Sequence, residues 1–141
     1  MKDPYVLDFT VPGEPHGKGR PRFVRATGRT YTDRKTASYE NLVRVAFDSA
    51  FPDWVPSEGS IELHLYFYFA PPKSWSKKKK EEALSKRLKK TSKPDLDNIE
   101  KAVCDALNGV AWADDSQIFS KWSVKEWAER SEARIVIYVR E

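Results

Sequence analysis

Residues 60–69 constrain the fold of this chain more than any other stretch. From 61 to 69 every odd position is large and apolar, while the even positions carry Glu62, His64 and two tyrosines. Because successive side chains of a strand point to opposite faces, this alternation predicts a strand with one buried and one outer face. His64 falls on the outer face, which favours a histidine on the sheet surface over a metal ligand. Such a strand requires partner strands and a layer of helices against its apolar face.

Partner strands are predicted near both ends of the sequence. Residues 5–11, 118–127 and 133–140 alternate in a similar way, and a turn is expected at 128–131. Since only this short turn joins the last two stretches, we expect the chain to end in an antiparallel pair.

Helical spacing marks three further stretches. From Thr32, an expected N-cap, apolar residues recur with helical period as far as Phe47. Residues 76–88 are lysine-rich and weakly amphipathic, whereas 95–107 carry a strong apolar stripe that ends at Asn-Gly. A Pro/Gly-rich loop and a basic stretch turning at Gly28 precede the first helix. The sequence of 141 residues therefore predicts a single domain of α+β (mixed α/β) class, one mixed sheet with helices packed on it.

The composition excludes several kinds of site. Cys104 is the single cysteine, and the two histidines lie far apart, so neither a disulfide nor a zinc site built from these residues is expected. The glycine-containing loop 13–19 lacks the spacing of a P-loop, so no nucleotide cofactor is expected. No apolar run is long enough for a membrane span, and a cytoplasmic protein is the expectation.

The charge is distributed unevenly along the chain. The net charge is only +4, but residues 18–35 carry a local charge of +6 and residues 73–93 a local charge of +8. Clustered lysines and arginines displace counterions from phosphates, which favours a partner such as DNA. A highly charged, solvated surface explains the same runs, and charge alone does not decide between the two.

A group of aspartates near the third helix suggests a metal site. Asp95 lies at the helix start, Asp97 in the first turn, and Lys101 one turn further along the same face. Asp114 and Asp115 follow the Asn-Gly turn and are expected to fold back to the same end of the sheet. Carboxylates without histidine or cysteine suit Mg²⁺, with Mn²⁺ as a possible substitute. Such an ion activates water against a phosphodiester, and Lys101 would either neutralise charge on the phosphate or orient one of the carboxylates.

Each of these residues also has a structural explanation. An aspartate at a helix start caps free N–H groups, which accounts for Asp95 or Asp97 alone. Lys101 and Asp105 form an ordinary i, i+4 pair, and Asp114-Asp115 are common turn residues. Spacing alone leaves both explanations open.

The full string of residues 93–118, KPDLDNIEKAVCDALNGVAWADDSQI, closely resembles the signature of RusA-type Holliday junction resolvases of bacteria and their phages. The loop GKGRPRF at 17–23 resembles the N-terminal basic motif of the phage-type branch of that family. Together the two stretches cover about 33 residues, and the longer one is the more specific.

This resemblance implies a RusA-like fold and a homodimer that binds four-way DNA junctions and nicks two strands symmetrically with Mg²⁺. It also implies a role in DNA recombination and repair, in a bacterial cell and possibly from a phage or prophage. The family's essential aspartates fall on Asp95, Asp97 and Asp115, with Asp114 beside them, and its functional lysine falls on Lys101. Asp105 matches a recurrent aspartate for which we expect a structural role.

The expected contacts with the DNA backbone are Lys18, Arg20 and Arg22 of the basic loop, and Lys93 at the start of the longer string. The lysine-rich segment 77–90 departs from the compact cellular members of the family. It leaves open whether the substrate is strictly a four-way junction.

Two other functions remain as alternatives. One is a non-catalytic, basic DNA-binding accessory protein whose aspartates only cap helices. The other is a relaxed nuclease that cuts flaps or replication forks.

Overall fold

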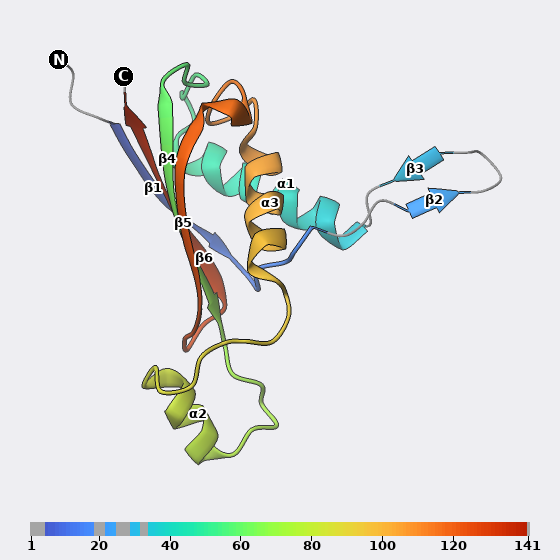
Figure 1. The fold of residues 1–141 in the computed structure, drawn as a ribbon, viewed down its shortest axis with the longest axis vertical. Helices are drawn as coiled ribbons and strands as arrows, with labels where there is room; N and C mark the ends of the chain where they lie inside the picture. Colours follow the sequence, from blue (N-terminus) through green and yellow to red (C-terminus); the bar gives the residue numbers. More distant parts are fainter. Residues whose placement is uncertain (1–4, 19–21, 25–28, 32–33, 141) are drawn as a thin grey trace.

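The structure is a computed structural model that describes residues 5–18, 22–24, 29–31 and 34–140. Its strands are β1 (Tyr5–Pro12), β2 (Arg22–Val24), β3 (Arg29–Tyr31), β4 (Ser60–Phe69), β5 (Ile118–Trp127) and β6 (Glu132–Arg140). Its helices are α1 (Arg34–Ala50), α2 (Lys77–Leu84), α3 (Leu96–Leu107) and the short 3₁₀ helix η1 (Asp115–Gln117). A four-stranded mixed sheet with helices on it confirms the predicted α+β class (Figure 1).

The order of strands in the main sheet is β1-β6-β4-β5. β4 pairs in parallel with β5, and β6 lies antiparallel between β1 and β4. The predicted antiparallel pair at the end of the chain is therefore wrong, because β4 separates β5 from β6. The burial of the strands explains this arrangement: β6 is apolar enough for the sheet interior, whereas β5 carries exposed and polar side chains that suit an edge.

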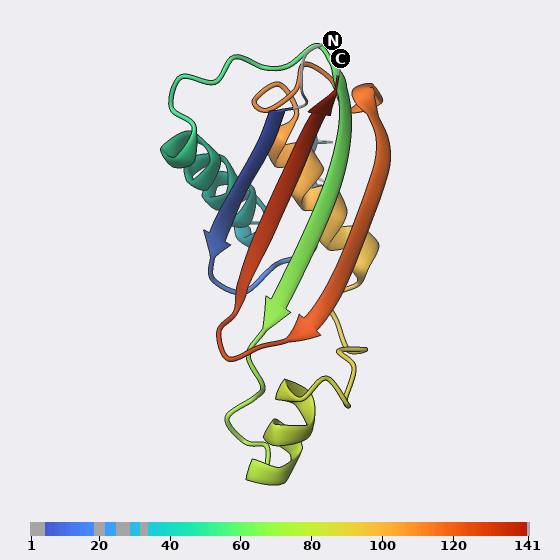
Figure 2. The ribbon, with the colours of Figure 1, turned by 90° about the vertical axis from the view of Figure 1, so that its left-hand side faces the viewer.

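The hydrophobic core lies between one face of the sheet and helices α1 and α3. The odd residues of β4, from Ile61 to Phe69, are all buried there, as the alternation predicted. Figure 2 shows the opposite face of the sheet, with the helices behind it. His64 lies on this open face, paired with Glu62 at 2.8 Å and packed against Tyr138, so its prediction as a surface histidine is confirmed.

The helix predicted at 76–88 is shorter in the structure. Ser76 caps α2 by accepting a hydrogen bond from the backbone N–H of Lys79. The helix ends at Leu84 because the chain turns at Lys86, whose φ of 71° lies in the left-handed region. α2 projects from one end of the sheet (Figures 1 and 2).

The basic stretch before α1 contains a small antiparallel pair, β2 with β3, in a sheet of its own. The expected turn at Gly28 and the N-cap at Thr32 lie outside the described residues. None of the helices in the described part of the chain has the length and apolar character needed to cross a membrane.

Candidate active site

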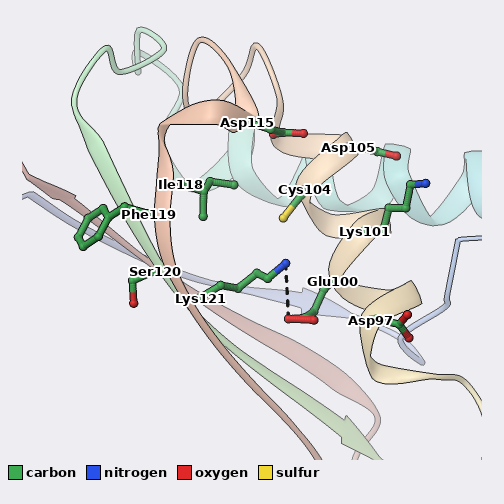
Figure 3. Close-up of a pocket in the computed structure, with 10 residues that line it drawn as sticks. All are labelled: Asp97, Glu100, Lys101, Cys104, Asp105, Asp115, Ile118, Phe119, Ser120 and Lys121. Atoms are coloured by element: carbon green, nitrogen blue, oxygen red, sulfur yellow. Dashed lines mark ion pairs between the residues drawn. The ribbon is translucent and has the colours of Figure 1, made fainter.

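A cleft runs between α3 and the start of β5, and Figure 3 shows the side chains that line it. From α3 come Asp97, Glu100, Lys101, Cys104 and Asp105, from η1 comes Asp115, and from β5 come Ile118, Phe119, Ser120 and Lys121. Four carboxylates thus face two lysines in one open groove. The groove carries an excess of negative charge, which disfavours a phosphate unless a cation is present.

The apolar stripe of α3 orients the polar side of the helix toward the cleft. Ile99, Val103 and Leu107 are fully buried against the sheet. Asp97, Lys101 and Asp105 share the opposite side at i, i+4 and i+8 and all line the cleft, as the spacing predicted. Asp97 and Asp105 are about 12 Å apart along the helix axis, since each residue rises 1.5 Å.

Asp115 lies toward the C-terminal half of α3, near Asp105, while Asp97 lies at the far end (Figure 3). The expectation that the Asp114-Asp115 pair would fold back to the same end of the sheet as the start of α3 is therefore wrong. The reason is the tight connection: Asn108 ends α3 and η1 begins only seven residues later. Buried Trp112 holds this connection, and its indole Nε1 donates a hydrogen bond of 2.7 Å to Oδ1 of Asp115.

Asp114 has a capping role in the turn. Its carboxylate accepts a hydrogen bond from the backbone N–H of Ser116, and its own N–H donates to Oε1 of Gln117. The hydrogen bonds with Ser116 lower the pKa of Asp114. Asp114 does not line the cleft, so of the two adjacent aspartates it is Asp115 that faces the candidate site.

Asp95 occupies the N-cap position of α3, but its carboxylate makes no capping hydrogen bond. The side chain of Asp95 is exposed. Helix capping therefore does not explain why an aspartate stands at this position. Asp95 lines a second cavity beside the cleft, formed with His16, Lys93 and the loop after β1. That loop lies close to α3: a Cβ on Gly17 would approach Cβ of Asn98 to 3.1 Å, so glycine permits the contact.

Lys18 was expected to contact DNA, but its ammonium lies between two carboxylates of this protein. Its Nζ is 2.7 Å from Oε1 of Glu40 and 2.9 Å from Oδ2 of Asp105. Burial acts to lower the pKa of Lys18, but the hydrogen bonds with both carboxylates outweigh it and raise that pKa. These pairs favour a structural role for Lys18 and fit the structural role expected of Asp105. Arg20 and the side chain of Arg22 lie outside the described residues.

Two lysines hold the loop that leads into α3. Lys90, a buried residue, donates from Nζ to the carbonyls of Ser92 and Lys93 and to the hydroxyl of Ser92. Lys125 donates from Nζ to the carbonyls of Ser92 and Pro94, at 2.9 Å each. Three successive carbonyls are thereby fixed immediately before Asp95. The backbone of Lys93, another expected DNA contact, is part of this arrangement, while its side chain is exposed.

Glu100 and Lys121 also line the cleft, although neither is among the site residues that the sequence predicts. Nζ of Lys121 is 3.8 Å from Oε2 of Glu100, which also accepts a hydrogen bond from Ser123. The signal was present in the strand, because Lys121, Ser123 and Lys125 alternate on the side that faces α3. Lys101 is exposed and, among the described residues, forms no ion pair with a carboxylate.

The carboxylate oxygens of the cleft are the type of ligand that a hard divalent cation prefers. Mg²⁺ in proteins is commonly held by one or two carboxylates, with water and substrate phosphate completing its shell. Asp97 and Asp115 face the same cleft and have no lysine within ion-pair distance in the described structure. Within the described residues, no three acidic, histidine or cysteine side chains form a ready-made metal cage.

Comparison with known proteins identifies the family. A family model described as endodeoxyribonuclease RusA matches residues 12–140. A protein of Bacillus subtilis (strain 168), uncharacterized protein YqaN, is 35% identical over 139 residues, which is 96% of each chain. The match spans both the basic loop and the cleft residues of α3, η1 and β5. The chain therefore belongs to the RusA family of endodeoxyribonucleases and is an endonuclease of the kind that resolves Holliday junctions.

Proposed function

We propose that this protein is a Mg²⁺-dependent resolvase that cuts four-way DNA junctions by paired, symmetric nicks in recombination and repair. The observation that carries the proposal is the shared cleft of Asp97, Asp115 and Lys101. Its excess of carboxylates over lysines suits phosphodiester chemistry only with a divalent cation in place.

The proposed ligands are Asp97 and Asp115, which line the same cleft from its two ends, and Asp95, which lies beside Asp97 at the start of α3. Bound Mg²⁺, or Mn²⁺ as a substitute, supplies Lewis acidity toward the scissile phosphate and lowers the pKa of the attacking water. Asp114, the fourth aspartate expected as a ligand, is the weakest of these candidates because its carboxylate caps η1.

Lys101 is proposed to neutralise charge on the phosphate as it becomes pentacovalent. Its ammonium is exposed along the cleft and is not paired with Asp105, the neighbour four residues away, because Asp105 pairs with Lys18. A lysine left free in this way can approach a bound phosphate oxygen at little cost.

Two symmetric nicks require two active sites, and each chain offers one such cleft. We therefore propose a homodimer, with one cleft acting on each strand. Mixing natural subunits with excess Asp97→Asn subunits tests this: singly nicked junctions should accumulate, because mixed dimers retain one working cleft. If the yield of doubly nicked junctions falls only in proportion to the fraction of natural protein, and no singly nicked junctions accumulate, the proposed homodimer is contradicted.

Substrate choice is tested by incubating the protein with a four-way junction, a flap, a fork and a linear duplex of the same sequence. We expect cutting of the four-way junction with Mg²⁺ and none after chelation with EDTA. Equal rates on flap, fork and junction would favour the relaxed nuclease. Tight binding without cutting in Mg²⁺ or Mn²⁺ would favour the non-catalytic DNA-binding protein.

A further inference from the structure

The segment from residue 73 to residue 90 forms a projection built around α2. Figures 1 and 2 show it standing off one end of the sheet. Trp75 packs edge-on against Trp127 of β5, with ring centroids 4.9 Å apart, and Ala83 of α2 is fully buried. The projection is thus an ordered extension, attached to the body by apolar contacts at its base.

Two of its lysines serve as anchors. Nζ of Lys86 lies 2.7 Å from Oε2 of Glu126 and donates to the carbonyl of Trp127. Lys90 is held by the loop carbonyls before α3, and its ammonium also lies over the rings of Phe69 and Trp127. The ammonium groups of Lys86 and Lys90 are thus bound to groups of the protein itself, and these contacts orient α2 relative to the sheet.

Apart from Lys80, which is half-buried, the other basic residues of the projection face solvent. They are Lys73, Lys77, Lys78, Lys79, Arg87 and Lys89, all exposed. Among the described residues, no carboxylate lies within ion-pair distance of any of them. Lys79 lies over the ring of Trp75 at 4.1 Å, which holds its charge on the surface.

This charge arrangement is unfavourable for the helix alone. Three lysines occupy the first turn of α2, where there is no acidic residue and where the helix dipole already presents positive charge. Like charges this close repel one another unless an anion is near. Phosphates relieve both effects, since they neutralise the lysines and complement the helix start.

We infer that the α2 projection binds the phosphate backbone of a duplex arm that leaves the cleft. Figure 1 shows that α3 begins at the end of the sheet from which α2 projects, and Asp97 belongs to the first turn of α3. Only residues 85–95 join α2 to that end of α3. This inference rests on the proposed function, because it takes the cleft to be the place of cutting.

The test compares two variants that each lose two positive charges. Lys77→Gln/Lys78→Gln removes charge from the projection, whereas Arg134→Gln/Arg140→Gln removes it from the open face of the sheet. The Kd of a four-way junction is measured without Mg²⁺ at several salt concentrations. We expect the projection variant to bind about tenfold more weakly, with a salt slope lower by about 1.8. The sheet variant should bind within about twofold of the natural protein.

Arm length locates the contact. α3 is about 18 Å long, and an arm of about 6 base pairs extends about 20 Å, so it barely leaves the cleft. The loss of affinity should appear with arms of about 20 base pairs and vanish with arms of about 6 base pairs. Equal losses in the two variants, or the same loss at both arm lengths, would overturn the inference.

This outcome is separate from that of the proposed function. Binding through α2 is measured without cutting, while cutting by the natural protein with Mg²⁺ tests the chemistry. If the affinity loss depends on arm length but the natural protein never cuts, the proposed function is wrong and the inferred contact of α2 with the arm still stands.

Discussion

The indole Nε1 of Trp112 donates a 2.7 Å hydrogen bond to Oδ1 of Asp115, so a fully buried ring positions a carboxylate at the edge of the cleft. Oδ2 of Asp115 accepts no hydrogen bond from the described residues, so this oxygen is available for a cation or water. It also explains why Asp115, rather than the adjacent Asp114, is the one directed to the cleft. The packing of the turn and the direction of the carboxylate therefore depend on one side chain.

Replacing Trp112 with phenylalanine removes this donor and keeps most of the ring. We expect kcat to fall about tenfold and the half-saturating Mg²⁺ concentration to rise, while the junction Kd stays within about twofold. Unfolding should be easier by about 1 kcal/mol, the usual cost of one hydrogen bond. Single-turnover cutting over a Mg²⁺ series measures the first two effects.

Trp54→Phe is the matched control for that variant. Nε1 of Trp54 donates to the carbonyl of Ala111 at 2.9 Å, outside the cleft. The Trp54→Phe variant should lose a similar free energy of unfolding and should cut the junction at the natural rate. If both tryptophan variants cut at the same rate, the hydrogen bond to Asp115 does not position the carboxylate.

Lys90→Met should destabilise the protein by about 1–3 kcal/mol, because the carbonyls of Ser92 and Lys93 lose a buried donor. The loop before Asp95 should loosen, and chemical denaturation with hydrogen exchange of that loop measures both effects. Lys89→Met, at an exposed neighbour, should change stability by less than about 0.5 kcal/mol. Equal stability of the two variants would show that the hydrogen bonds of Lys90 do not hold the loop.

Lys18→Met should destabilise the fold without weakening DNA binding. Glu40, which is only 9% exposed, would keep Arg44 at 3.6 Å as its nearest cation, and the expected cost is about 1–3 kcal/mol. Because the pKa of Lys18 is raised, its contribution is fully present below the ordinary lysine value and is lost only above the raised one. Denaturation should thus give the same deficit at pH 7 and pH 9. A large loss of junction affinity with unchanged stability would instead support the DNA contact.

Cys104 should take no part in the chemistry, although it lines the cleft. Burial raises the pKa of its thiol to about 12, so the thiolate fraction at pH 8 is on the order of 10⁻⁴. Iodoacetamide should modify the native protein slowly and the unfolded protein rapidly, as followed by mass spectrometry. Cys104→Ala should cut at close to the natural rate, and a loss of cutting with an intact fold would contradict this.

The strands and helices with strong periodicity could be predicted from the sequence. Which strands lie next to one another in the sheet could not. Alternation located β4 and the burial of its odd residues, and helical spacing located α3 with its polar side. The same patterns carry no information on which strands pair, so they predict a pair of β5 with β6, whereas β6 lies between β1 and β4. Pairing depends on the burial that the whole sheet can supply, which a local pattern does not contain.

The candidate site was similarly predictable in its residue types and less so in its geometry. The aspartates of α3 follow from helical spacing, but the direction of each carboxylate depends on long-range partners. Asp105 and Lys18 pair across 87 positions of sequence, and Glu100 is reached by Lys121 from β5. Such contacts form only when the sheet, the loop after β1 and α3 have assembled.

The most direct test is the rate of four-way junction cutting with Mg²⁺ by Asp97→Asn, compared with Asp105→Asn. The two substitutions make the same chemical change on the same side of α3. Asp97→Asn should reduce cutting by at least about 10³-fold while junction binding and stability persist. Asp105→Asn should lose stability through Lys18 and keep cutting within about fivefold. Cutting by Asp97→Asn at the natural rate would contradict a metal-bearing active site in this cleft.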